Sequence, residues 1–451
     1  MNTMAIQYSG TTPRIARFPW LMFLFLAAVF FLCEHDLYLS KRGPEAFNAS
    51  PVGAAVTEGS LSRRIVFLSL GLFGVASLVR RRGARLQINS QLGRIMVFFA
   101  GWAVLSLVWA EDTALTLRRL VVFAILCIAA AAIARTCSLR EIVLLTFFCS
   151  ALFLVIGMSA EIALGTFRPF APGYRFAGTQ HWTYQGINCA LLLLSGVAAG
   201  DIEKRRRMLF RACALLGLIF LILTATRGAF AAAFLALSVY LIAVCSGRAK
   251  IILAPVLGIV FCAVVLIFGN TLLADVKSAV MLGRDDSTVD SFTGRTAIWE
   301  DCRKYIEERP VLGYGYGSFW NERHIAEISN LEDWEVAGGH SSYIDCLLDL
   351  GLVGLAAYFL VLLSGVGRSF ALYRASHAHA FAFSAAFLIF CLADGLLESV
   401  MLEGTLLTFL SILALVRLGF VCGPEATEGS IGETCRHQRR GLHLQRGRYA
   451  S

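Results

Sequence analysis

The sequence predicts an all-α polytopic membrane protein with about 12 transmembrane helices. Hydrophobic residues make up 57% of the 451 residues, only 16% are charged, and the mean hydropathy is +0.68. Soluble domains carry about 25% charged residues, whereas a spanning helix needs roughly 20 mostly apolar residues. Apolar runs of that length recur along the chain, without the alternating pattern of a membrane β-barrel.

The apolar runs define the predicted helices in chain order. No A-x-A cleavage site follows the first run, which predicts a retained helix rather than a signal peptide. Only a few residues separate the seventh and eighth runs, which predicts a tight helical hairpin. The predicted helices are 18–34, 64–79, 93–110, 119–134, 141–162, 182–199, 208–225, 228–246, 250–269, 343–366, 380–398 and 402–421.

Basic residues occur in alternate loops, and the positive-inside rule then assigns the two faces. The clusters at 80–85, 204–207 and the C-terminal tail are predicted to be cytoplasmic, as are both termini. The predicted domains are helices one to nine over 1–269, a periplasmic loop with short helices over 270–342, helices ten to twelve over 343–421, and a poorly ordered basic tail over 422–451. Lys and Arg in the short loops between spans account for the net charge of +9, so no nucleic-acid partner is expected.

Common soluble-enzyme motifs are missing from the sequence. There is no G-x-x-x-x-G-K-[ST], H-E-x-x-H or G-x-S-x-G motif, and the run Gly313–Gly317 does not follow a strand as a dinucleotide loop would. The 13 cysteines form no C-x-x-C pair, and most lie inside apolar runs, where they are predicted to be small packing residues.

Residues 270–340 form a long polar segment between two apolar runs. A single histidine, His340, lies where this segment meets the next apolar run. Ser342 with Asp345 fits a capping box, which predicts a helix start near Ser341 or Ser342. The positive end of that helix disfavours imidazolium, and a general base must be neutral near neutral pH. His340 is therefore a candidate base, with an interfacial histidine of no chemical role as the alternative.

Several arginines are predicted on the same face as His340. Arg227 begins the helix after the hairpin turn, Arg295 lies in the polar segment, and Arg168 and Arg175 lie in the preceding outer loop. Arginine forks match phosphate oxygens, so together these side chains can neutralise a diphosphate without a metal ion. The alternatives are snorkelling for Arg227 and an ion pair with the preceding aspartates for Arg295.

Aromatic and acidic residues complete the candidate site. Sugars stack on aromatic rings, although such rings also form interfacial belts. The candidate glycan contacts are Tyr314, Tyr316, Trp320 and Tyr343. Asp394, Glu398 and Glu403 are predicted near the outer end of helix eleven, either as acid partners or as interfacial residues.

Five motifs between residues 220 and 365 occur in a recognisable order. They are Arg227-Gly228, then Thr293-Gly294-Arg295 with Trp299, then Arg309-Pro310-Val311-Leu312-Gly313-Tyr314-Gly315-Tyr316-Gly317-Ser318-Phe319-Trp320, then Gly339-His340-Ser341-Ser342-Tyr343, and then Leu350-Gly351-Leu352-Val353-Gly354-Leu355. This order resembles the O-antigen ligase and O-antigen polymerase superfamily, and within it the exopolysaccharide-production polymerases of Gram-negative bacteria.

The resemblance implies a GT-C-like glycosyltransferase that needs no metal or other cofactor and uses a glycan on undecaprenyl diphosphate as donor. It implies His340 as the base and Arg227 and Arg295 as diphosphate contacts, with Arg175 matched less closely. Ser341 stands where many members of the family have Asn. The expected partners are the lipid-linked donor, a saccharide or lipid A–core acceptor and the bacterial inner membrane, with a chain-length regulator and a flippase as further candidates.

Three functions stay open from the sequence. A polymerase and a ligase share this chemistry and differ in the acceptor, which is a growing glycan or lipid A–core. A transporter is the third, because twelve helices suit many carriers. Carriers tend to have broken helices and polar sites at the midplane, whereas the charges here are predicted at the outer surface.

Overall fold

A computed structural model describes residues 19–35, 61–80, 84–88, 90–245, 247, 295–332, 336–399 and 403–422. In this part of the chain, seven helices are long and apolar enough to cross a membrane. The protein is thus an all-α polytopic membrane protein. The helices are α1 (Trp20–Glu34), α3 (Leu61–Val79), α4 (Gln91–Leu105), α5 (Thr113–Thr136), α6 (Leu139–Ala163), α7 (Trp182–Ile202), α8 (Arg207–Leu223), α9 (Arg227–Val244), α12 (Arg295–Glu308), α13 (Glu322–Glu332), α14 (Ser342–Ser376), α15 (His379–Asp394) and α16 (Leu406–Phe420).

Each predicted helix other than 250–269 coincides with a helix of the structure. The helix predicted at 250–269, the loop residues 270–294 and the tail from 423 lie outside the described residues. The largest difference is α14, which has 35 residues and continues ten positions beyond its predicted end at 366. Its last part carries basic residues, which ended the apolar run but do not prevent helix formation.

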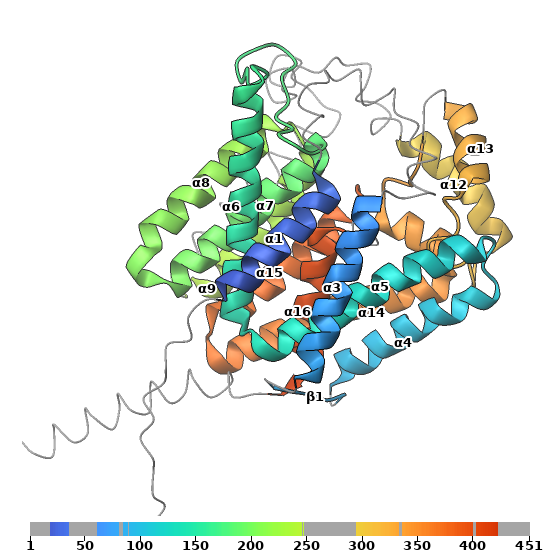
Figure 1. Cartoon of the computed structure of the whole chain (residues 1–451), viewed down its shortest axis with the longest axis horizontal. Coiled ribbons are helices and arrows are strands. Elements are labelled where there is room, and N and C mark those ends of the chain that lie inside the picture. The colour runs from blue at the N-terminus through green and yellow to red at the C-terminus, as the bar shows by residue number, and fades with distance from the viewer. Residues whose placement is uncertain are drawn as a thin grey trace, which may run out of the picture.

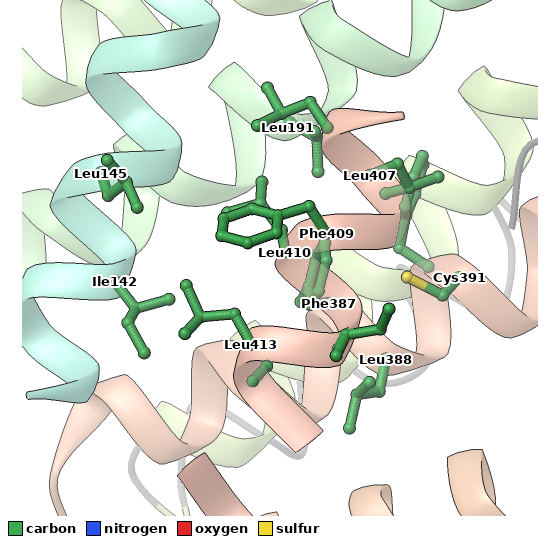
Figure 2. Close-up of a cluster of buried hydrophobic side chains, with 14 of the residues drawn as sticks. Ile142, Leu145, Leu191, Phe387, Leu388, Cys391, Leu407, Phe409, Leu410 and Leu413 are labelled. Carbon is green, nitrogen blue, oxygen red and sulfur yellow. The ribbon is translucent and has the colours of Figure 1, made fainter. Parts of the chain in front are cut away.

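The core of the bundle surrounds α15 and α16. Both helices are apolar on every side, as expected for helices enclosed by others, and most of their residues are buried. Figure 2 shows Phe387 and Cys391 of α15 and Phe409 of α16 beside Leu191 of α7 and Ile142 of α6. Cys391 is a free thiol that is fully buried here, in line with its predicted packing role.

One end of the bundle ties the first helices to the last. The short strands β1 (Arg85–Leu86) and β2 (Val421–Cys422) pair in antiparallel fashion at the lower edge of the helical bundle in Figure 1. Arg135 Nε of α5 donates to Ala84 O at 3.0 Å beside them. Arg85, Arg135 and Cys422, which are predicted on the cytoplasmic face, therefore lie together at this end of the bundle.

The turn between α8 and α9 lies at the opposite end. It spans residues 224–226, and Ala225 has a left-handed φ of 54°. The two helices then diverge, because α8 packs mainly along α7 and α9 mainly along α15. The predicted tight connection is therefore confirmed, but its helices do not pack along each other as an antiparallel pair.

A break in α14 positions the segment that precedes this helix, residues 295–332 and 336–341, which we call the outer segment. Gly351 has φ 64° and ψ −168°, which interrupts the helix and frees carbonyl groups of the preceding turn. Tyr314 N donates to Leu348 O and Gly315 N donates to Asp349 O, both at 2.8 Å. Because buried backbone groups in a membrane must find partners, the break and the docked segment require each other.

The glycine run 313–317 makes this docking possible. All three of its glycines have positive φ, and a Cβ at Gly313 would lie only 2.6 Å from the backbone of Asp349. The run is thus a turn that packs against α14 and not a dinucleotide loop.

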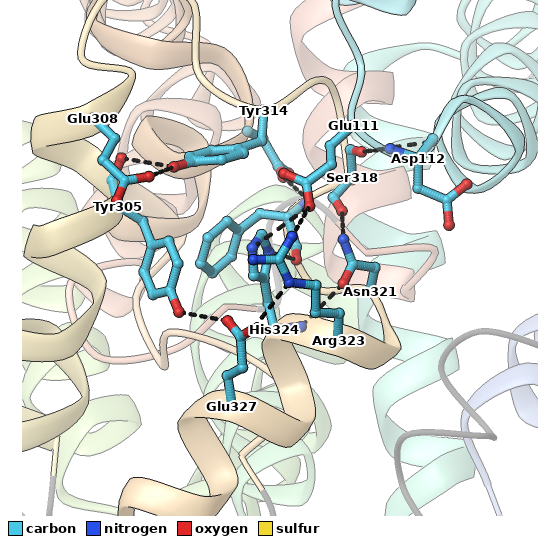
Figure 3. A network of polar contacts seen from close by, with 12 residues as sticks. Glu111, Asp112, Tyr305, Glu308, Tyr314, Ser318, Asn321, Arg323, His324 and Glu327 are labelled. Atoms are coloured by element: carbon cyan, nitrogen blue, oxygen red, sulfur yellow. Dashed lines mark hydrogen bonds and ion pairs between the residues drawn. The ribbon is translucent and has the colours of Figure 1, made fainter.

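Polar contacts join this turn to its neighbours. Asp112 N, in the turn between α4 and α5, donates to Ser318 Oγ at 2.7 Å. Tyr305 OH of α12 donates to Glu327 Oε2 of α13 at 2.9 Å. Figure 3 shows these bonds within one network, and in Figure 1 α12 and α13 lie beside the ends of α4 and α5. The outer segment is therefore held from several sides.

We expect Gly351→Ala to disrupt the fold, because its φ and ψ are accessible essentially only to glycine. A Cβ there would also lie 2.1 Å from Val311 O. The measurement is the thermal unfolding midpoint of the purified protein in detergent.

Gly367→Ala is the matched control within the same helix. A Cβ at Gly367 meets nothing within 4 Å, so this variant should keep or slightly raise the midpoint, since alanine favours helix by about 1 kcal/mol. Equal midpoints for the two variants would contradict the proposed role of the break.

Candidate active site

Hydrogen bonds of the preceding residue, Gly339, hold the turn that carries His340. Gly339 O accepts a hydrogen bond from Trp299 Nε1 of α12 at 2.8 Å. Gly339 N donates to Asp345 Oδ1 of α14 at 2.9 Å, and the same oxygen accepts from Trp320 Nε1 at 2.8 Å. His340 itself has a left-handed φ of 48°, an uncommon conformation that surrounding contacts must maintain.

The start of α14 is where the sequence predicts it, at Ser342, but the predicted capping box is wrong. The side chain of Ser341 donates to Gly395 O at 3.3 Å instead of capping the helix, and Asp345 bonds to Gly339 and Trp320. Ser342 Oγ donates to Glu398 O at 2.8 Å. These bonds attach the His340 turn to the segment that follows α15.

Arg295 forms an ion pair with Glu398 inside the protein. Arg295 donates to Glu398 Oε1 at 2.7 Å, and the side chains are only 18% and 10% exposed. The aspartates at 285, 286 and 290, the partners considered from the sequence, lie outside the described residues. The ion pair instead joins α12 to a residue more than one hundred positions later.

Arg175 lies in the loop between α6 and α7, which is held in place by hydrogen bonds to Glu161. Glu161 at the end of α6 accepts hydrogen bonds from Tyr174 OH at 2.5 Å and from Gly178 N at 2.7 Å. Arg175 Nε donates to Thr224 O at 3.1 Å, and its guanidinium lies 4.3 Å from the ring centre of Trp182. Arg168 of the same loop is exposed to solvent.

Arg227 is the first residue of α9 and is half-buried. The preceding residue, Thr226, does not cap the helix with its side chain but donates to Trp182 O at 3.2 Å. A Cβ at Gly228 would lie 3.4 Å from Leu397. The start of α9 therefore contacts both the start of α7 and the segment after α15, which also bonds to the start of α14.

Three helix N-termini consequently meet at one end of the bundle, those of α7 at Trp182, α9 at Arg227 and α14 at Ser342. Each N-terminus carries a partial positive charge of roughly half a unit. Together with the arginines at 175, 227 and 295, they make this end suited to a multiply charged anion.

Two histidines of the site are neutral at neutral pH. Burial and then the positive charge of Arg295 lower the pKa of His340 from 6.5 to about 4. Burial, and then the charges of Arg175 and His340, lower the pKa of His181 from 6.5 to about 4. The neutrality of His340 matches the sequence prediction, but burial is its main cause rather than the helix dipole alone.

The acidic residues lie close to these groups. Burial raises the pKa of Glu398 to about 7, against the opposing effect of Arg295. Asp394 at the end of α15 is 1% exposed, and neither of its carboxyl oxygens has a hydrogen-bond partner among the described residues. Tyr184 OH donates to Glu403 Oε2 at 2.9 Å.

The four candidate glycan contacts are packed inside the protein. Each is less than a tenth exposed, and Tyr343 OH donates to Leu392 O at 2.5 Å. Tyr314 and Trp320 belong to the small hydrophobic cluster between α12, α13 and α14, and Tyr316 to the main core. These rings therefore pack in the protein interior, and little of their surface is left for sugar stacking.

Sequence reasoning missed His181 and the hydrogen-bonding role of Asp345. His181 stands outside any motif, although its place directly before an apolar run made it a possible N-cap. The contacts of Asp345 involve residues distant in sequence, and no local pattern indicates them.

Residues 212–359 match a family model described as O-antigen ligase. The match supports assignment to the O-antigen ligase and polymerase superfamily. The matched region contains Arg227, Arg295 and His340 and ends before Glu398. The assignment to this superfamily implies lipid-linked glycan substrates and a protein of the bacterial inner membrane. No curated protein matches the chain.

We expect Trp299→Phe to loosen the His340 turn, because phenylalanine keeps the ring but cannot donate to Gly339 O. A hydrogen bond of this kind contributes about 1 kcal/mol. The rate at which diethyl pyrocarbonate modifies His340, measured by peptide mass spectrometry, should rise.

Tyr373→Phe is the control, because Tyr373 OH also donates to a backbone carbonyl, that of Ala243, at 3.3 Å, near the other end of α14. It should leave the modification rate of His340 unchanged. An unchanged rate in Trp299→Phe would mean that Trp299 does not hold the turn.

Proposed function

We propose that the protein polymerises saccharide units carried on undecaprenyl diphosphate into exopolysaccharide or O-antigen at the periplasmic face of the inner membrane. The observation that carries this proposal is the neutral, half-buried His340 beside Arg295, at the end of the bundle where three helix N-termini meet. The proposal retains about twelve spans with both termini in the cytoplasm, in keeping with the basic residues Arg85 and Arg135 that lie together away from the site.

The diphosphate of the donor binds to the arginines. Arg227 extends from the start of α9, Arg295 from the start of α12, and Arg175 from the anchored loop before α7. Their charges and the helix dipoles offset the charge that develops on the leaving diphosphate, and such electrostatic stabilisation is usually the largest catalytic effect. No metal or other cofactor enters this mechanism.

His340 removes the proton from the acceptor hydroxyl. The hydroxyl oxygen then bonds to the anomeric carbon, the bond from that carbon to the phosphate oxygen breaks, and undecaprenyl diphosphate leaves with the electron pair. A pKa of about 4 makes His340 a weak base in the empty site. Bound diphosphate counters the charge of Arg295 and raises this pKa, so the base strengthens when the donor is present.

The acceptor distinguishes the polymerase from a ligase. The matched family model is described as O-antigen ligase, which favours transfer of the glycan to lipid A–core as the second candidate. Both reactions use the same donor and the same base.

We expect His340→Asn to abolish transfer, because asparagine tolerates the left-handed backbone but cannot act as a base. The measurement is surface polysaccharide in a strain that produces the variant at normal levels. In that strain, single lipid-linked repeat units should accumulate if the protein is a polymerase, and long chains on the carrier if it is a ligase.

His377→Asn is the matched control, because His377 also has a left-handed φ, of 53°, but lies at the other end of α14. It should support normal polysaccharide. Full-length polymer in the His340→Asn strain would refute the base assignment.

The pH dependence should report the same histidine. The base must be neutral, so the limb of kcat/KM that reports His340 in the free enzyme should lie near pH 4, the pKa of His340, below any change that Glu398 causes near pH 7. The acid limb of kcat should lie at higher pH, because the bound diphosphate raises that pKa. Arg295→Gln should move the limb of kcat/KM upward, since it removes a cation that lowers the pKa. Coincident limbs for kcat and kcat/KM would contradict the coupling between donor and base.

A further inference from the structure

His181 is a second histidine at the proposed active site, and its ring has a defined orientation. It immediately precedes α7 as the N-cap residue, and its Nδ1 accepts a hydrogen bond from Thr183 N at 3.3 Å. Its ring also packs against Trp182, with ring centres 4.1 Å apart. Both contacts restrain the ring.

The cap bond determines the tautomer of His181. A nitrogen that accepts a hydrogen bond offers its lone pair and carries no proton, so the proton of a neutral ring lies on Nε2. Burial and the nearby charge of Arg175 keep the ring neutral at neutral pH, with a pKa of about 4. His181 therefore presents an N–H donor at Nε2, whereas its basic nitrogen is engaged by the backbone.

The surroundings of His181 place it next to the proposed diphosphate contacts. Arg175 lies over the ring of Trp182, and Thr226, which precedes Arg227, donates to Trp182 O at 3.2 Å. His340 is close enough for its charge to affect the pKa of His181. His181 thus lies near the proposed diphosphate contacts and within electrostatic reach of the proposed base.

We propose that His181 is a catalytic residue whose Nε2–H donates a hydrogen bond to a phosphate oxygen of the lipid-linked donor. The proposal rests on the function proposed above. His181 transfers no proton in this role. When the bond between the anomeric carbon and the phosphate oxygen breaks, the electron pair passes to the diphosphate, and the hydrogen bond offsets part of its new charge.

The same geometry separates the tasks of the two histidines. A ring whose Nδ1 is held by a backbone N–H cannot accept a proton there without losing its cap. His340 therefore stays the proposed base, and His181 acts as a donor whose bond strengthens as the leaving group gains charge. Interactions that strengthen in the transition state raise kcat more than they lower KM.

His181→Ser tests the proposal, because serine is a preferred N-cap residue but is too short to reach a phosphate. The full-length protein in nanodiscs is assayed with a purified lipid-linked repeat unit. We expect a thermal midpoint close to that of the parent protein, a decrease in kcat of roughly 100-fold, in the range found for the loss of one such donor, and a smaller change in KM.

Ser90→Ala is the control for the loss of a cap alone. Ser90 caps α4 at the opposite end of the bundle, where its Oγ accepts from Gly93 N at 3.0 Å. It should lower the midpoint while the kcat of folded protein stays unchanged. A His181→Ser protein that keeps parental kcat would overturn the proposal and leave His181 with a capping role only.

His340→Asn, assayed in parallel, separates the two hypotheses. Loss of activity in His340→Asn with parental activity in His181→Ser overturns the role of His181 alone. Parental activity in His340→Asn overturns the proposed base, and with it the assignment of tasks to the two histidines.

Discussion

The break in α14 at Gly351 is the constraint on which the outer end of this protein depends. A helix interrupted inside a membrane protein exposes carbonyl groups that water cannot reach. Here the turn at 313–317 supplies the missing N–H donors. That turn leads into Trp320, which bonds to Asp345, and Asp345 in turn holds the peptide before His340. A backbone requirement within the bundle is thereby linked to the position of the proposed base.

The electrostatics of the site follow from the same architecture. Three helices begin at one end of the bundle, and the arginines lie at or beside two of these starts and at the start of α12. In the absence of a ligand, Glu398 balances Arg295 at 2.7 Å. Buried charge of one sign is costly when it has no counter-charge, so an internal carboxylate stabilises the site while it is empty. A bound diphosphate then competes with that carboxylate for the same guanidinium.

Much of the helical layout could be predicted from the sequence, because apolar runs of sufficient length have few alternatives in a membrane. The extent of α14 could not, since its last turns are too polar for the hydropathy signal and are stabilised by helix geometry and packing. The start of α14 was predictable from the change to an apolar run, although the predicted capping box is not formed. The partners of Asp345, Gly339 and Trp320, leave no local pattern in the sequence. Arg295 and Glu398 are likewise brought together only by the fold. The aromatic residues show how composition misleads, because Tyr314 and Trp320 occur in a polar segment yet fold into a small core of their own.

The docking of the outer turn has a consequence for how this protein can vary. Its main attachments to α14 are between backbone groups, and a backbone hydrogen bond does not depend on the identity of the side chain. Only the glycines of the run are constrained by close approach, whereas Val311 and Leu312 point outward and are 52% and 43% exposed. Surface side chains of this segment can therefore be exchanged without undocking it. The outer end combines a frame held by backbone bonds with a replaceable surface, and in such an arrangement recognition can diversify without a change in the frame.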